Sequence, residues 1–122
     1  MATLFLEAGK NTEELLQFIT SEIDDSTLDK IELHREVVKP DNLATEPLTI
    51  AATLALSTTL VITVGRIIER WLENRKQLDH LRIVADGFKE SDEAGKGLAQ
   101  VSKAHAAVSI SYGLPKIIQK KR

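Results

Sequence analysis

The stretch LTIAATLALSTTLVITV, from Leu48 to Val64, decides the class of this protein, because its seventeen residues carry no charge. A strongly charged continuation, GRIIERWLENRK, follows at once. A charge-free run of this length is typical either of a helix buried in a protein core or of a membrane span. With Thr45 as a cap and Pro47 in the first turn, we predict one long helix over about residues 46–77.

The periodicity of this run bears on the choice between the two interpretations. On a helix of about 100° per residue, the bulky side chains share one face, and the opposite stripe is small or polar. A lipid-exposed span has no reason to segregate its bulk, whereas a helix lying on a sheet does, so the pattern favours a buried core helix. Two alternatives stay open. One is a transmembrane helix at about residues 47–68 with Arg66, Arg70, Arg75 and Lys76 on the cytoplasmic side, and the other is a surface amphipathic helix.

The small stripe of this helix is the candidate interaction site. Its residues are small or weakly polar for about three turns, and charged residues follow at one rim. The stripe consists of Ala51, Ala52, Ala55, Thr58, Thr59, Ile62, Arg66, Glu69, Arg70 and Glu73. An apolar centre with a charged edge is typical of a protein–protein interface, so we predict that the stripe packs against a second copy of the chain or against another protein. The alternative is that another helix of the same chain covers it.

Shorter segments surround this run. A short β-rich run predicts a strand at 2–7, and apolar residues at every second position predict strands at 29–38, 81–86 and 107–112. Apolar residues at helical spacing predict helices at 12–24 and from about 91 onward. The order β-α-β-α-β-α-β predicts an α+β fold with a mixed four-stranded sheet and one long central helix. We expect one domain over residues 1–115 and a basic tail at 116–122.

Composition excludes several kinds of chemistry. The chain has 122 residues and no cysteine, so it has no disulfide, no thiolate nucleophile and no cysteine zinc site. Its net charge of −2 hides an asymmetry, because residues 1–46 carry −7 and residues 47–122 carry +5. This asymmetry indicates either two differently charged surfaces of one domain or a polar molecule that stacks head to tail. An acidic chain with few aromatic residues does not favour nucleic-acid binding.

The polar residues form no recognisable catalytic, metal or cofactor site. His34, His80 and His105 are the three histidines, and nothing local brings them together as metal ligands. Asp79 and His80 are adjacent, but neighbours on a strand point to opposite faces. We therefore predict a protein that is not an enzyme and that binds no metal or cofactor. The competing hypothesis is a small hydrolase that uses Asp79, His80 and a distant serine.

Residues 48–87 resemble a known family. The Ala/Leu-rich run, its exit RIIERWLENR at 66–75 and the strand LRIVADG at 81–87 resemble the small effector-associated constant component proteins of bacterial conflict systems. The upstream residues EELL at 13–16 and the strand after them fit the same layout. Members of this family look like companions of varied effectors and have no catalytic role of their own. The effectors include caspase-like peptidases, TIR domains and other proteases.

The resemblance implies an adaptor or assembly component that associates with an effector protein in a bacterial immune or conflict system, such as antiviral defence. Its partner would be a caspase-like peptidase or another protease, and we also expect a homo-oligomer. The competing interpretation is a small membrane-associated protein with one transmembrane helix. The first residues, MATLFLEAGK, lack the basic start and long apolar stretch of a signal peptide, so we expect a cytoplasmic protein.

Overall fold

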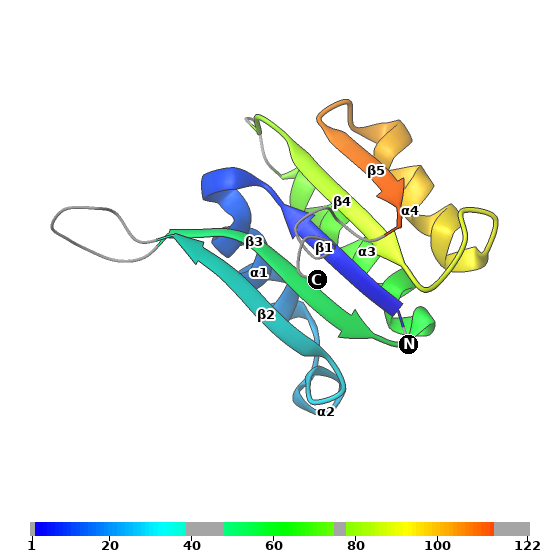
Figure 1. Cartoon of the computed structure of the whole chain (residues 1–122), viewed down its shortest axis with the longest axis horizontal. Helices are drawn as coiled ribbons and strands as arrows, with labels where there is room; N and C mark the ends of the chain where they lie inside the picture. Colours follow the sequence, from blue (N-terminus) through cyan, green and yellow to red (C-terminus); the bar gives the residue numbers. More distant parts are fainter. Residues whose placement is uncertain (1, 39–47, 75–77, 114–122) are drawn as a thin grey trace, which may run out of the picture.

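The computed structural model describes residues 2–38, 48–74 and 78–113, which build a five-stranded sheet with helices on one face (Figure 1). In chain order the elements are β1 (Ala2–Glu7), the 3-10 helix η1 (Gly9–Asn11), α1 (Thr12–Glu22), α2 (Asp25–Leu28), β2 (Glu32–Val38), β3 (Leu48–Leu56), α3 (Thr58–Glu73), β4 (Leu81–Asp86), α4 (Glu93–Ala104) and β5 (Val108–Tyr112). The predicted α+β class is confirmed, but the sheet has five strands where the sequence predicts four.

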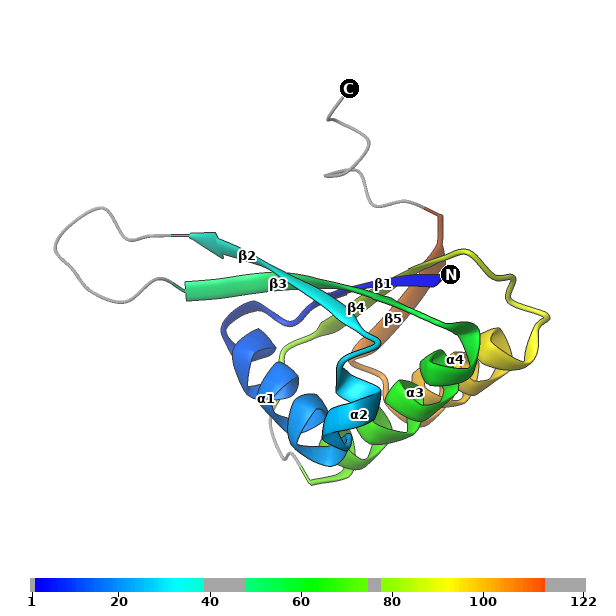
Figure 2. The same ribbon diagram turned by 90° about the horizontal axis from the view of Figure 1, so that it is seen from below.

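The sheet has the strand order β2-β3-β1-β4-β5, which places the N-terminal strand at its centre. β1 pairs antiparallel with both β3 and β4, and β2 pairs antiparallel with β3. β4 and β5 are parallel, and α4 forms the crossover between them. The sheet is therefore mixed, as predicted. Figure 2 shows that α1, α2, α3 and α4 all lie on the same side of it.

The prediction of one long helix over residues 46–77 is wrong. Residues 48–56 form β3, and α3 begins only at Thr58. Ser57 separates the two elements, because its backbone is extended and its hydroxyl accepts a hydrogen bond from the N–H of Leu60 at 3.3 Å. A serine in this geometry is a helix N-cap. The charge-free run is therefore a strand followed by a helix.

The position of β3 explains why its sequence reads like a helix. β3 lies inside the sheet, between β2 and β1. Leu54 belongs to the main core on the helix side and Ala51 to the apolar cluster on the helix-free side, so both faces of β3 are buried. An interior strand with apolar or small residues on both faces shows no alternation of charge, so its periodicity resembles that of a buried helix.

The remaining predicted elements are confirmed within a few residues. β1 and β4 coincide with the predicted strands at 2–7 and 81–86, and β2 and β5 lie within the predicted strands at 29–38 and 107–112. α1 lies within the predicted helix at 12–24, and α4 matches the helix expected after about residue 91. The short helices η1 and α2 have no counterpart in the prediction.

Some predictions concern other parts of the chain. The alternative prediction is a transmembrane helix at 47–68, but residues 48–56 form a strand. No helix in the described ranges is long and apolar enough to cross a membrane. The helix start at Thr45 and Pro47, the helix end at 75–77 and the basic tail at 116–122 lie outside the described residues.

The main core lies between the sheet and the helices. Its largest fully buried side chains are Leu4, Leu6, Leu15, Leu16, Ile19, Leu56, Ile68, Leu81, Ile83, Leu98, Val61 and Val64. The helix-free face of the sheet has a second, smaller apolar cluster, formed by Phe5, Ala51 and Val84. The guanidinium of Arg82 lies over the Phe5 ring, 5.7 Å from its centroid, which is the geometry of a cation–π contact.

A bulge in β3 shapes this second cluster. Glu36 of β2 pairs with Ala51, but the next residue, Val37, pairs with Thr49, so Ile50 is an extra residue in β3. Ile50 packs against the helix-free cluster to which Ala51 also belongs. Thr49 is correspondingly turned into the interior and is only 9% exposed.

Candidate interaction site

The predicted interaction stripe is divided between two elements. Ala51, Ala52 and Ala55 lie in β3, where Ala51 and Ala52 are 2% and 1% exposed. Successive residues of a strand point to opposite faces, so the single helical stripe that would group all ten residues does not exist. The other members stay together on α3, and they are Thr58, Thr59, Ile62, Arg66, Glu69, Arg70 and Glu73.

α3 packs closely against its neighbours on both sides. Its buried residues are Val61, Val64, Gly65, Ile67, Ile68, Trp71 and Leu72. Toward α1, Arg70 Nη2 donates a hydrogen bond to Glu22 Oε1 at 2.8 Å, so this member of the predicted stripe contacts α1. Toward α4, a Cβ added at Gly65 would lie 3.5 Å from Leu98 Cδ2, in van der Waals contact. α3 and α4 therefore pack closely at Gly65, where a methyl group would also fit in ordinary contact.

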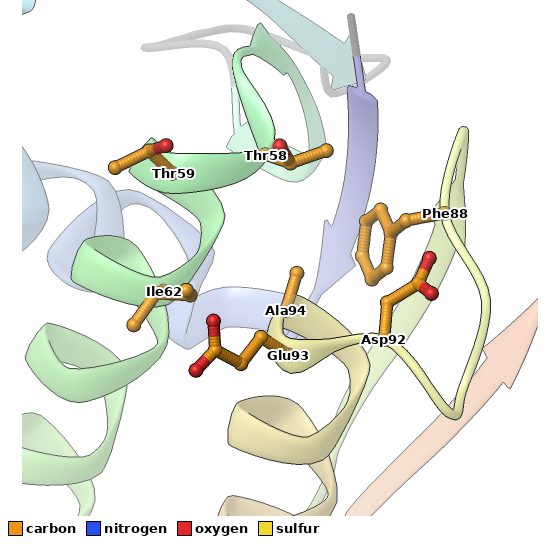
Figure 3. Close-up of a pocket in the computed structure, with 7 residues that line it drawn as sticks. All are labelled: Thr58, Thr59, Ile62, Phe88, Asp92, Glu93 and Ala94. Atoms are coloured by element: carbon orange, nitrogen blue, oxygen red, sulfur yellow. The ribbon is translucent and has the colours of Figure 1, made fainter.

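An open groove lies between α3 and α4 and consists of two adjoining hollows. The first has a volume of about 210 Å³ and is lined by Thr58, Thr59, Ile62, Phe88, Asp92, Glu93 and Ala94. The second has a volume of about 310 Å³ and is lined by Ile62, Gly65, Arg66, Glu69, Glu93, Gly97 and Gln100. Ile62 and Glu93 line both hollows, which we together call the α3–α4 groove. Figure 3 shows the first hollow, with α3 on one side and the start of α4 on the other.

Local contacts hold the loop wall of the groove in place. The ring of Phe88 meets the ring of Tyr112 edge to face, with centroids 5.9 Å apart and an interplanar angle of 88°. The Tyr112 hydroxyl donates to the carbonyl of Gly95 at 3.3 Å, and the carboxylate of Asp92 accepts from the N–H of Lys89 at 2.9 Å. Burial, and then the charge of Glu90, raise the pKa of Tyr112 above its ordinary value. The hydroxyl therefore stays protonated and able to donate at neutral pH.

Gly95 is required for this arrangement. A Cβ at this position would lie 2.3 Å from the carbonyl oxygen of Lys89 and 2.7 Å from the backbone of Glu90. These atoms are backbone atoms that cannot move aside independently, so only glycine lets α4 begin so close to the preceding loop. Gly97 is different, because a Cβ there would meet nothing within 4 Å. It faces the open space of the groove.

Apolar and polar side chains line the groove in similar measure. Ile62 and Phe88 are partly buried against the main core, and the rest of their apolar surface lines the groove. Carboxylates of both helices and the guanidinium of Arg66 stand along the edges. Five residues of the predicted stripe line the groove: Thr58, Thr59, Ile62, Arg66 and Glu69. The α4 side of the groove is not predicted from the sequence. Its one local indication is the pair of glycines at 95 and 97 in an otherwise helical segment.

The histidines lie on separate elements. His34 is on β2 and His105 follows the last residue of α4, while His80 precedes β4. His80 Nε2 lies 2.8 Å from Glu7 Oε2 at the surface of the sheet, which gives it a hydrogen-bond partner on β1. Within residues 2–38, 48–74 and 78–113, no group of three or more His, Asp or Glu side chains is arranged to hold a metal ion.

Comparisons with protein-family models, with curated proteins and with solved structures find no match for this chain. The resemblance to the effector-associated constant component family therefore stays a prediction from the sequence. The α3–α4 groove is the feature of the described structure from which a function can be inferred.

Proposed function

We propose that this protein is a non-enzymatic, cytoplasmic adaptor that binds an effector protein through the α3–α4 groove, as a component of a bacterial immune or conflict system. The observation that carries the proposal is the groove itself, in which two hollows of about 210 and 310 Å³ are joined by Ile62 and Glu93. The nature of the partner, an effector such as a caspase-like peptidase, follows from the resemblance of residues 48–87 to the effector-associated family.

The shape of the groove favours a protein partner over a small molecule. Sites for small molecules are usually single concavities in which a few polar groups converge on the ligand. Here the two hollows follow one another along the paired helices, so successive side chains of a partner segment can enter them. The apolar surface of Ile62 and Phe88 gains from losing contact with water. The charged side chains of Glu93, Arg66 and Glu69 can meet complementary charges of a partner.

The rigidity of the groove also supports the proposal. Its walls are two packed helices and a loop held by the Tyr112 and Asp92 hydrogen bonds. A surface that is ordered before binding loses little conformational freedom when a partner docks. The site therefore suits recognition of a defined partner segment.

A substitution at Gly97 tests the proposal with little risk to the fold. Gly97→Trp places an indole in open space, because an added Cβ meets nothing within 4 Å, and it removes a helix-weakening glycine. The measurement is the dissociation constant for the effector encoded beside this gene, obtained by calorimetry with purified proteins. We expect Gly97→Trp to weaken binding at least about tenfold, as the blocking of an interface centre does.

Two matched variants serve as controls. Gly97→Ala adds only a methyl group, and Lys103→Trp places the same indole at an exposed position of α4 that lines neither hollow. Both should bind like the unaltered protein. Unchanged affinity of a folded Gly97→Trp variant, or an equal loss in Lys103→Trp, would contradict binding through the groove.

A further inference from the structure

β2 is an outer strand of the sheet with an unusual apolar side chain. Val37 is the single large apolar side chain that is exposed among the described residues, at 42%. Outer strands usually carry charges or stay short, which prevents pairing with another chain. The opposite outer strand, β5, has five residues, and its apolar Val108, Ile110 and Tyr112 pack against the main core. The seven-residue β2 is thus the outer strand that exposes a large apolar side chain to solvent.

The alternation of β2 assigns its side chains to two faces. Leu33 packs against the main core, so Leu33 and, two and four residues later, Arg35 and Val37 lie on the helix side of the sheet. His34 and Glu36 lie on the helix-free side, and both are exposed. The helix side of β2 is therefore largely apolar, and its helix-free side is polar.

The charge of Arg35 is already compensated within the chain. Its Nε donates to Glu13 Oε1 at 2.9 Å, and its Nη2 donates to Glu13 Oε2 at 3.1 Å. This two-point contact joins β2 to the first turn of α1. On the helix-free face, the exposed side chains of His34 and Glu36 are available to contact a strand that pairs with β2.

Charge and the exposed Val37 together favour one antiparallel register for two copies of β2. A register centred on His34 would place Glu32 opposite Glu36 twice, and a register centred on Glu36 would place two Glu36 side chains opposite each other. Like charges directly opposite each other destabilise a strand pair. The register centred on Arg35 instead places His34 opposite Glu36 twice, and an imidazole N–H can donate to a carboxylate. The two Arg35 side chains are opposite each other at the centre of this register. Each is paired with the Glu13 carboxylate of its own chain, which offsets the repulsion between them. A register centred on Leu33 would also pair a histidine with a glutamate, but it would place Val37 beyond the start of the partner strand.

We propose that two copies of this chain associate edge to edge through β2, antiparallel and centred on Arg35, to form a continuous sheet across the dimer. This register also places the exposed Val37 of each copy opposite Leu33 of the other, on the helix side. Leu33 lines an apolar hollow of about 150 Å³ together with Ile31 and Leu28, so Val37 meets apolar surface there. The pairing covers the exposed valine and extends the backbone hydrogen bonds of the outer strand.

A charge swap at the helix-free face tests this register. His34→Glu places Glu opposite Glu36, and Glu36→Lys places Lys opposite His34. Each single variant should therefore raise the dimer dissociation constant about tenfold. The double variant restores opposite charges in the same register, so its dissociation constant should return toward that of the unaltered protein. Sedimentation equilibrium of the full chain gives these constants, and circular dichroism checks that the exposed substitutions leave the fold intact.

Matched controls assign the effect to β2. Ser111→Lys introduces a charge at an exposed position of the other outer strand, β5, and should leave the dimer unchanged. Gly97→Trp should also leave it unchanged, so failure of effector binding and failure of dimerisation are separate results. The proposal is overturned by a monomeric unaltered protein, by a double variant no tighter than the single variants, or by dissociation of the dimer in Ser111→Lys.

Discussion

The contact between Arg35 and Glu13 joins an outer strand to a helix through two residues that are 22 positions apart in the sequence. Hydrogen bonding from the Arg35 guanidinium is the largest cause that holds the pKa of Glu13 below its ordinary value of 4.5. Because the folded-state pKa is lowered, the contact stabilises the fold above the unfolded-state pKa, and this contribution is lost as the pH falls through the folded-state pKa. Both side chains are more than a third exposed, so solvent screens the interaction.

Glu13→Gln should therefore destabilise the protein at neutral pH and have little effect in acid. We expect a loss below about 1 kcal/mol at pH 7, because the pair is exposed. The loss should vanish in acid, once the pH is well below the folded-state pKa and the carboxyl of the unaltered protein is also protonated. Urea unfolding at neutral pH and in acid measures the difference. Glu73→Gln, at an exposed position of α3, is the control, and an equal loss from Glu13→Gln at both pH values would argue against this origin of the stability.

At the scale of secondary structure, Ser57 determines where β3 ends and α3 begins. The hydroxyl of Ser57 satisfies the N–H of Leu60, one of the donors at the helix start that has no partner within the helix. Ser57→Ala should lower the free energy of unfolding by about 0.5–2 kcal/mol, as loss of an N-cap does. Ser57→Asp should retain most of the stability, because a carboxylate caps equally well. Chemical denaturation measures both variants, and equal losses would show that capping is not the role of Ser57.

Most strands could be predicted from the sequence, whereas β3 could not. β2, β4 and β5 keep exposed polar residues at alternate positions, as in Glu32, His34 and Glu36 of β2. β1 is buried on both faces, but it is a short β-rich run that a glycine ends. β3 has Ala, Thr and Leu on both faces, because one face packs in the main core and the other in the helix-free cluster. A serine inside an uncharged run was the local signal for its end, but the surrounding threonines made that signal ambiguous.

The candidate site was predictable only on its α3 side. Ile62, Arg66 and Glu69 follow helical spacing within one segment, so the sequence alone groups them. The opposite wall comes from α4, about thirty residues later, and its position depends on how Gly65 and Leu98 pack. Such a contact between distant segments leaves no periodic pattern. Helical spacing through residues 48–64 also groups the alanines at 51, 52 and 55 with the groove residues, but these alanines lie in the strand β3.

At the scale of the whole molecule, the sheet depends on its N-terminal strand. β1 is the third of five strands and pairs with β3 on one side and β4 on the other. Leu4 and Leu6 of this strand are both completely buried in the main core. Without β1, the β2–β3 pair and the β4–β5 pair would have no common neighbour in the described sheet.

A chain that lacks residues 2–7 should therefore fail to fold cooperatively. The removed segment provides the central pairing of the sheet and several buried side chains, each of which contributes roughly 1.5–3 kcal/mol by burial. Thermal unfolding followed by circular dichroism should show no sigmoidal transition in the shortened chain. Thr3→Ser, which keeps the strand intact, is the control. A cooperative transition in the shortened chain would mean that the strand order has less influence on stability than we infer.

β3 has a composition that favours aggregation when the strand is not part of the folded sheet. It is a nine-residue strand without charge or proline, and such segments stack into cross-β fibrils when they are free to pair with copies of themselves. In the native protein, β2 and β1 occupy both of its hydrogen-bonding edges. As long as the sheet is folded, its neighbours β2 and β1 therefore keep β3 from pairing with the same strand of another copy.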